Sequence, residues 1–536
     1  MNQAASTVGA FGTGRGPVVT QNTMVSTGHP LATATGLRVL MEGGNAFDAA
    51  IAAAATIAVV EPSSNHVGGD VFALCRPASS GVVEAVNASG PAPSSISRAD
   101  YPGEIPKRGL RSATLPGAVA AWDLINDRWG TKSVDALLGP AISYATDGFA
   151  VDIAFVTTMQ SALEEISHYP STMAVLCPGG RPLAPGDKII QPDLAQTLRD
   201  IAADGADGFY QGRFAEHLIR ASQTEQGAWT EADFEASPAE LVQPLRTFYR
   251  GYEVLEQPLP SQGYLLLAYL NIVEGFDLSS LQFGSPDCLH IMIEAKKLAG
   301  ADRHAYVGDP AHVEAPIHTL VSKEFAARRR MMLNPARASN VYGPGDPSMS
   351  GRDTTALSVV DGDGNAITLI QSVFHQYGSA YIVPGTGVLL NNRMNGFSLD
   401  PESPNVLAGG KRPIHTLNTY MVQQEGELTL LGGSPGGQYQ TQANFQVISN
   451  LIDHGMHWQA AIDAPRWYHD EDTGAVSLET RFDSHVAGSL EQRGHSVEWT
   501  SAFTEHARSQ GIMLTPSNGA RYGATDPRWH GQVLGY

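Results

Sequence analysis

The stretch "GRDTTALSVVDGDGNAITLI" (Gly351–Ile370) decides the expected fold. After Asp353, apolar and polar residues alternate, a turn of Asp, Gly and Asn follows, and the alternation resumes, which predicts a β-hairpin. Residues 330–353 are rich in Gly, Pro, Ser and Asn without periodicity, which predicts an exposed linker. The chain therefore passes from a linker into a core strand at the bond between Asp353 and Thr354.

The spacing of apolar residues differs between the two sides of that bond. Residues 26–61 predict two helices, with Gly43-Gly44 ending the first and Asn45 capping the second. Most of residues 110–330 has apolar positions three to four apart, as in helices. After residue 353, short β-rich runs such as "AITLIQSV", "VLLNN" and "LTLLGG" precede a helix, "TQANFQVISNLIDHG". We expect a helix-rich part, 1–353, and a strand-rich part, 354–536.

Composition excludes several classes of protein. The 536 residues are 42% hydrophobic and 16% charged, which is typical of a globular protein, and the formal charge is −20. Nucleic acids and anionic membranes need a basic surface, so neither is an expected partner. Cys75, Cys177 and Cys288 show no metal-ligand spacing and are expected to be buried thiols. With no recognisable signal peptide, apolar span, metal motif or phosphate loop, we expect a cytoplasmic protein without metal or cofactor.

A threonine at a linker–strand junction has a chemical interpretation. Its hydroxyl can attack the preceding carbonyl and form an ester, which water opens to release a chain that begins with Thr354. The new α-amine has a reference pKa of about 8, so it can act as general base for the hydroxyl of the same residue. The alternative is that Thr354 and Thr355 are ordinary β-branched strand residues.

A series of motifs favours the first interpretation. In order they are "EGGNAFDAAIA", "ATLPGAVAAW", "DGFYQG", "YRGYEV", "PSQG", "EAKKLAGADRHAYVGDP", "TTALSVVDGDGNAI", "GVLLNNRM", "GKRPIHTLN", "GSPGG", "DAPRW" and "YGATDPR". With them the chain resembles the γ-glutamyltransferase family of N-terminal-nucleophile hydrolases over nearly its whole length. The resemblance implies an α+β fold, a four-layer αββα sandwich. It also implies a zymogen that cleaves itself between Asp353 and Thr354, giving a heterodimer of large and small subunits that can dimerise further.

The resemblance assigns roles to single residues. Thr354 matches the nucleophile, and Thr355 matches a second threonine with a supporting hydroxyl. Ser372, in "IQSVF", matches a hydroxyl that orients the nucleophile. Gly436 and Gly437, in "GSPGG", match the backbone N–H donors of an oxyanion hole, a role compatible with a plain tight turn.

The positions that hold a γ-glutamyl group in the family are changed here. Ser89 stands at an arginine position, Phe374 at an asparagine and Gly396 at an aspartate, while His415 and Thr416 replace two serines and Arg393 replaces a glutamine. A hydrogen bond to a charged group is worth about 1.5–3 kcal/mol. Losing three therefore removes roughly 4–9 kcal/mol, or about three to six decades of affinity.

The resulting pocket predicts a different substrate. Arg393 is a candidate clamp for a carboxylate, with a structural ion pair as the alternative, and His415 is either a pocket residue or a core histidine. The leading hypothesis is an amidohydrolase or acylase acting on a small acyl-amide, of the oxamate type or a dicarboxylic monoamide. This branch resembles oxamate amidohydrolase and the cephalosporin acylases. The alternatives are a γ-glutamyltransferase or glutathione hydrolase with a rebuilt pocket, and a non-catalytic scaffold or binding protein.

Overall fold

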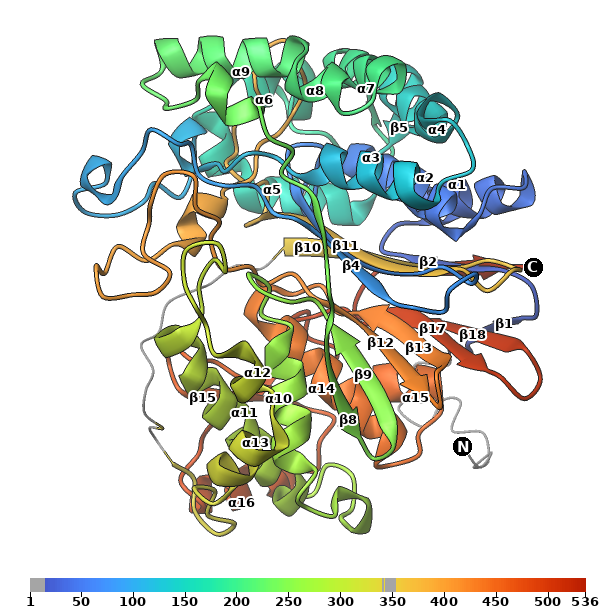
Figure 1. Ribbon diagram of the computed structural model, residues 1–536, viewed down its shortest axis with the longest axis vertical. Coiled ribbons are helices and arrows are strands. Elements are labelled where there is room, and N and C mark those ends of the chain that lie inside the picture. Colours follow the sequence, from blue (N-terminus) through green and yellow to red (C-terminus); the bar gives the residue numbers. More distant parts are fainter. Residues whose placement is uncertain (1–14, 340–341, 343–352) are drawn as a thin grey trace.

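Two seven-stranded sheets are stacked face to face between two layers of helices in a computed structural model (Figure 1). The structure describes residues 15–339, 342 and 353–536. Apolar side chains from the facing sheets meet between them, among them Met24, Leu74, Leu255 and Leu431. This arrangement is the predicted αββα sandwich.

Every strand pair within these two sheets is antiparallel. The β10 sheet has the order β19 (Gln532–Gly535), β2 (Met24–Thr27), β10 (Asp353–Val360), β11 (Ala366–Phe374), β3 (Asp70–Arg76), β4 (Glu84–Ala88) and β7 (Glu240–Val242). The β12 sheet has the order β1 (Val18–Thr20), β18 (Ala520–Thr525), β17 (Gln510–Thr515), β13 (Glu427–Gly433), β12 (Thr419–Gln424), β9 (Tyr252–Glu256) and β8 (Leu245–Tyr249). Both sheets contain strands from either side of the Asp353–Thr354 bond, so the two parts share one core.

Helices α1 (Pro30–Met41) and α2 (Ala46–Val60) cover the β10 sheet (Figure 1). As predicted, Asn45 caps α2, and Asp48 completes a capping box with it. All fifteen residues of α2 are buried, because alanine on every face lets sheet and helices approach closely. The other helices of this layer are α3 (Ala118–Trp129), α4 (Val134–Asp147), α5 (Ile153–Ser167), α6 (Pro170–Leu176), α7 (Pro192–Asp204), α8 (Asp207–Tyr210) and α9 (Arg213–Thr224).

The opposite helical layer lies on the β12 sheet (Figure 1). It consists of α10 (Tyr264–Val273), α11 (Pro286–Tyr306), α12 (Ile317–Leu320), α13 (Lys323–Arg330), α14 (Gln440–Ile452), α15 (Trp458–Asp463) and α16 (Ser484–Gln492). A small sheet of β14 (Trp467–His469), β15 (Ala475–Glu479) and β16 (Ser496–Thr500) packs beside it, and β5 (Phe149–Ala150) pairs with β6 (Lys188–Ile189).

Some sequence expectations need adjustment. The run "VLLNN" is not a strand: Leu389 and Leu390 make only isolated bridges, because each pairs with a different segment. In the expected linker 330–353, Leu333, Ala338 and Tyr342 are buried, while residues 340–341 and 343–352 lie outside the described part. The three cysteines are free and buried, as expected.

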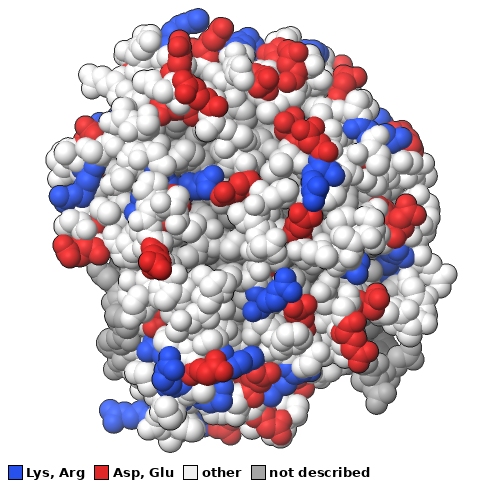
Figure 2. Space-filling model, viewed as in Figure 1, with Lys and Arg blue, Asp and Glu red and all other residues white. Residues whose placement is uncertain are grey.

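The surface agrees with the composition. On the face shown in Figure 2, acidic and basic side chains are interspersed and form no continuous basic patch. No helix among the described residues combines the length and apolarity that a membrane span requires.

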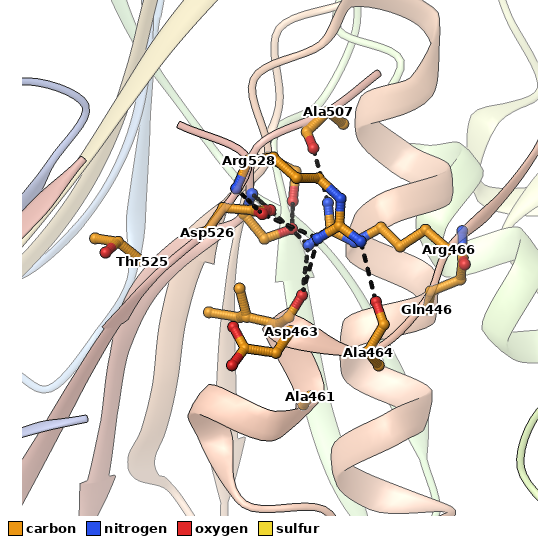
Figure 3. A network of polar contacts seen from close by, with 12 residues as sticks. Gln446, Ala461, Asp463, Ala464, Arg466, Ala507, Thr525, Asp526 and Arg528 are labelled. Carbon is orange, nitrogen blue, oxygen red and sulfur yellow. Dashed lines mark hydrogen bonds and ion pairs between the residues drawn. The ribbon is translucent and has the colours of Figure 1, made fainter. Parts of the chain in front are cut away.

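A buried cluster of charges joins the end of β18 to α15 and β15 (Figure 3). Asp526 pairs with Arg466 at 2.7 Å and with Arg528 at 2.9 Å, and Arg528 also pairs with Glu479 at 2.6 Å. Burial alone raises the pKa of Asp526, but Arg466 and Arg528 hold it below its ordinary value. Asp526 also accepts a hydrogen bond from the amide of Ser509 at 2.7 Å. The carboxylate therefore fixes three chain segments at once.

We expect Asp526→Asn to lower the free energy of unfolding by about 3–5 kcal/mol, because two buried guanidinium groups lose a shared counter-charge. The measurement is urea denaturation followed by fluorescence. Glu42→Gln is the matched control, since Glu42 pairs with Arg38 at an exposed site, and it should change stability by less than about 1 kcal/mol. Equal effects of the two substitutions would contradict the structural role of the cluster.

Candidate active site

The strand pair that carries Thr354 is irregular at that residue. Asp353 lies opposite Phe374, but Thr355 lies opposite Gln371, so β11 has one extra residue in the ladder. Such a bulge bends the strand and changes the direction of its side chains. Phe374, at the edge of the irregularity, has φ of 83°, which is uncommon for a bulky residue. The distortion lies at the expected cleavage bond.

The hydroxyl of Thr354 lies among polar side chains between the two sheets. Thr354 is 2% exposed, and its Oγ1 donates to Oγ of Ser372 at 3.4 Å. The Ser372 oxygen also accepts from the backbone N–H of Phe374 at 2.8 Å, which fixes its position. The structure thus brings together the predicted nucleophile and its predicted orienting hydroxyl.

A third side chain reaches Thr354 that the sequence did not indicate. Gln440, the first residue of α14, donates from Nε2 to Oγ1 of Thr354 at 3.3 Å. Nδ2 of Asn418, just before β12, donates to the side-chain oxygen Oε1 of Gln440 at 3.2 Å. The only sequence signal was an amide-rich helix start directly after "GSPGG", "QYQTQAN".

The glycine turn before α14 is held at each carbonyl. The amide of Arg508 donates to Pro435 at 2.8 Å, and the amide of Tyr439 donates to Gly436 at 3.1 Å. Nε2 of Gln262 donates to the carbonyl of Gly437 at 3.3 Å.

The φ angles of Gly436 and Gly437 are 149° and 57°, and a Cβ on Gly436 would lie 2.4 Å from the carbonyl oxygen of His506. Position 436 therefore requires glycine, and the left-handed φ at position 437 favours it. Fixed peptide planes keep N–H groups preorganised, as an oxyanion hole requires.

Thr355 lies on the other face of β10, as strand alternation requires. A Cβ built on Gly28 would be 2.7 Å from Oγ1 of Thr355, so this hydroxyl packs against the backbone beside α1. Thr354 and Thr355 both line a cavity of about 10 Å³, together with Pro435 and Trp529. This volume suits about one water molecule.

Arg393 is fully buried beside Phe374, which lies two residues after Ser372 on β11. Its Nε donates to Asp70 at 3.0 Å, and its guanidinium lies over the ring of Phe374 at 4.7 Å. The two terminal nitrogens of Arg393 have no hydrogen-bond partner among the described residues. The Nε edge of the guanidinium is therefore in an ion pair, as in the structural alternative, and the role of Arg393 as a carboxylate clamp stays a prediction.

Burial shifts the ionisation of this group of residues. Desolvation raises the pKa of Asp70 to about 6, although Arg393 and the N–H of Gly90 oppose the shift. Desolvation also lowers the pKa of Arg393 to about 10, while Asp70 opposes that shift. At neutral pH the pair is ionised, because the carboxylate and the guanidinium are in contact. The sequence did not reveal Asp70, whose only signal was an acidic residue at the start of a buried strand.

His415 is also fully buried, and both of its ring nitrogens lack partners among the described residues. Burial lowers its pKa well below the ordinary value, and the charges of Arg393 and Arg412 lower it further. The ring is therefore neutral and packs against Phe72, with the ring centroids 5.1 Å apart.

Two other predicted pocket residues, Ser89 and Thr416, are also buried. Ser89 donates its hydroxyl to Oδ1 of Asn87 at 2.7 Å. Thr416 is buried, and its carbonyl accepts from Gln262 at 3.2 Å and from Asn418 at 2.9 Å. Ser89 thus supplies no charge at the position that the resemblance aligns with an arginine.

The fold also gathers histidines at positions that the sequence spacing did not reveal. Two groups of three potential metal ligands are His29, Asp152 and His530, and His290, Glu294 and His495. Nε2 of His290 is 2.8 Å from the carbonyl of Asn334, and its Nδ1 is 2.8 Å from Nε2 of His495. The amide of Leu31 donates to Nδ1 of His29. Burial lowers the pKa of His495 to about 3 and of His29 to about 4. The contacts of both groups are therefore those of neutral histidine rings held by hydrogen bonds.

Comparisons with known proteins agree with this geometry. A model of the gamma-glutamyltranspeptidase family matches residues 32–536. The glutathione hydrolase-like YwrD proenzyme of Bacillus subtilis is 34% identical over 525 residues, covering 97% of this chain and 99% of that protein. The oxamate amidohydrolase proenzyme of Klebsiella pneumoniae is 35% identical over 520 residues, covering 95% and 97%.

Among solved structures, the cephalosporin acylase from Bacillus halodurans has a TM-score of 0.91 at 34% identity, and the match covers 100% of this chain and 99% of that one. The relatives named here carry different activities in their names, yet each matches this chain almost from end to end. The two relatives from Bacillus subtilis and Klebsiella pneumoniae are proenzymes, and the chain belongs to the gamma-glutamyltranspeptidase family.

Proposed function

We propose that this protein is an autoprocessed hydrolase that cleaves small acyl-amides through an N-terminal Thr354, with a carboxylate on the acyl group bound by Arg393. The observation that carries the proposal is the pairing of two features on one strand. Ser372 contacts the Thr354 hydroxyl, and Phe374, two residues later, lies against the buried guanidinium.

Self-cleavage is the first reaction. The Thr354 oxygen attacks the carbonyl carbon of Asp353, the C–N bond between the two residues breaks, and the nitrogen takes up the hydroxyl proton. The resulting ester is opened by water, which leaves a carboxylate on Asp353 and a free α-amine on Thr354. The bulge opposite this bond supports the reaction, because it leaves the peptide outside a regular ladder.

Turnover repeats the same chemistry on a substrate. The α-amine accepts the proton of the Thr354 hydroxyl as the oxygen attacks the acyl carbon, and it then gives that proton to the departing amine. Water next adds to the acyl-enzyme, the ester bond breaks, and the oxygen regains a proton. The N–H groups of Gly436 and Gly437 would stabilise the negative charge on the acyl oxygen in both steps.

The position of Arg393 favours a short acyl group. Asp70 lies directly opposite Ser372 in the sheet, and facing residues in antiparallel strands have Cβ atoms about 4.5–5.5 Å apart. Ser372 contacts Thr354, and Asp70 contacts Arg393, so the guanidinium lies on the order of 10 Å from the nucleophile. This separation suits a dicarboxylic monoamide of about glutaryl length better than oxamate, whose carboxylate is bonded directly to the acyl carbon.

The unpartnered nitrogens support a carboxylate ligand. A buried donor without a partner costs about 1–3 kcal/mol, and more when it is charged. A carboxylate can accept from both terminal nitrogens of a guanidinium at once. Binding would therefore satisfy Arg393 in a site where the protein itself leaves two nitrogens unpaired.

The alternatives receive less support. A γ-glutamyltransferase with a rebuilt pocket needs another cation for the substrate carboxylate, and Ser89 is hydrogen-bonded to Asn87 instead. A non-catalytic binding protein would not need the contact between Thr354 and Ser372 or two tightly placed glycines.

The purified protein should consist of two chains of roughly 37 and 19 kDa, as expected when the 56.9 kDa of the chain is divided in proportion to 353 and 183 residues. Intact mass and N-terminal sequencing should show that the smaller chain begins Thr-Thr-Ala. Thr354→Ala should give a single folded, inactive chain, because the attacking oxygen is gone. A protein that remains full-length yet active would exclude this mechanism.

Arg393→Lys should lower kcat/KM for glutaryl-p-nitroanilide ten-fold or more, because an ammonium cannot bind a carboxylate bidentately. Pentanoyl-p-nitroanilide has the same chain length without the carboxylate and should lose much less. Self-cleavage, followed on denaturing gels, should continue. Equal losses for both anilides would indicate a structural ion pair and would remove the carboxylate from the proposed substrate.

We expect water to be the main acyl acceptor, because no dedicated contact for an acceptor amine is recognisable among the motif residues. Adding glycylglycine to the glutaryl-p-nitroanilide assay should leave the rate of p-nitroaniline release nearly unchanged. A many-fold stimulation, with formation of the glutaryl dipeptide, would instead support a transferase.

A further inference from the structure

Three side-chain amides form a chain that ends on the Thr354 hydroxyl. Asn444, one turn along α14 from Gln440, donates to Oδ1 of Asn418 at 2.7 Å. Asn418 donates to Oε1 of Gln440 at 3.2 Å, and Gln440 donates to Oγ1 of Thr354 at 3.3 Å. All three amides are fully buried. The chain therefore connects helix α14 to the nucleophile through groups shielded from water.

The direction of this chain is determined without reference to Thr354. The backbone N–H of Asn418 points to Oε1 of Gln440 at 3.3 Å, and a backbone N–H can only donate. The Gln440 oxygen is therefore the acceptor, which leaves its NH₂ group for Thr354. Asn418 is oriented in the same way, because its NH₂ group also donates to the carbonyl of Thr416 at 2.9 Å.

This geometry has a chemical consequence for the Thr354 oxygen. Because Oγ1 accepts from Gln440, its own proton must point elsewhere, and it points to Ser372 in this structure. When that proton leaves, negative charge develops on the Thr354 oxygen. The oxygen already accepts a hydrogen bond from the neutral amide of Gln440, and such a bond is strongest in a buried site shielded from water. In the acyl-enzyme the same oxygen bridges the ester, and it becomes negative again as the ester bond breaks.

We propose that Gln440 is a further catalytic residue, which donates a hydrogen bond to the Thr354 oxygen whenever that oxygen attacks or leaves. Asn418 and Asn444 are positioning residues that act through it. The amide transfers no proton, because the proton moves between the Thr354 oxygen and the α-amine. The inference rests on the proposed function, in which Thr354 is the nucleophile.

The test compares Gln440→Met with Gln446→Met. Methionine keeps the length of the side chain and removes the donor. Gln446 lies on the same helix, is nearly as buried, and donates to the carbonyls of Trp467 and Gln442 at 2.8 and 3.1 Å, away from the site. We expect Gln440→Met to slow self-cleavage and to lower kcat for glutaryl-p-nitroanilide ten-fold or more, with little change in KM. Gln446→Met should lose stability but keep its kcat.

Gln440→Glu should give a pH-dependent loss of rate, which a change in packing alone would not produce. Its ionised carboxylate can accept from Asn418 but has no proton for Thr354, so the variant should be slow at pH 8. A protonated carboxyl can donate, so its deficit relative to the unsubstituted protein should shrink as the pH falls. Both self-cleavage and turnover report this deficit. The pH dependence of Gln440→Glu keeps the test available if Gln440→Met folds poorly.

The outcomes separate this inference from the proposed function. If Thr354→Ala still cleaves itself or turns over substrate, the proposed function fails, and the role of Gln440 fails with it. If Thr354→Ala is inactive while Gln440→Met retains normal rates, only the role of Gln440 is overturned. Equal losses of kcat in Gln440→Met and Gln446→Met, or a Gln440→Glu deficit that is independent of pH, would overturn it as well.

Discussion

The extra residue in β11 opposite the Asp353–Thr354 bond is the constraint on which the site depends. Regular pairing would direct the Ser372 side chain by simple strand alternation and would hold the Asp353–Thr354 peptide in a flat ladder. The bulge instead brings the Ser372 oxygen to the Thr354 hydroxyl and strains Phe374 into a positive φ. A strained residue persists only where its surroundings hold it firmly. Here the guanidinium of Arg393 covers the Phe374 ring, so the ion pair of Arg393 and the bulge stabilise each other.

The site is assembled from segments that are distant in the sequence because both sheets draw strands from both parts of the chain. The glycine turn before α14 is closed by Tyr439 within the turn and is held by Arg508 and Gln262, which come from two distant segments. The charge cluster around Asp526 reaches the same region through Ser509, whose hydroxyl is 2.6 Å from that of Ser434. After cleavage at residue 353 the two chains would therefore remain joined by the shared core.

Polar groups in the site fall into two kinds. Thr354, Ser372, Gln440 and Asn418 form a connected set in which each group has a partner, which makes for a rigid nucleophile. Arg393 and His415, by contrast, keep buried nitrogens that have no partner in the part of the chain that the structure describes. Native proteins rarely leave such groups unsatisfied unless something else binds there. The satisfied set is therefore suited to chemistry, and the unsatisfied groups are suited to recognition.

The sequence by itself determined the local structure: the hairpin at Thr354, the capping of α2 by Asn45, and the ordered motifs that indicate the family and its layered fold. These features depend on neighbouring residues or on short patterns, which can be read directly along the chain. Only the tertiary structure decided that Asp70 pairs with Arg393, that Gln440 reaches Thr354, and that Thr355 faces Gly28. Asp70 and Arg393 are 323 residues apart, and Gln440 is 86 residues from Thr354. Contacts at such separations depend on sheet register and a bulge, and neither has a signature in local composition.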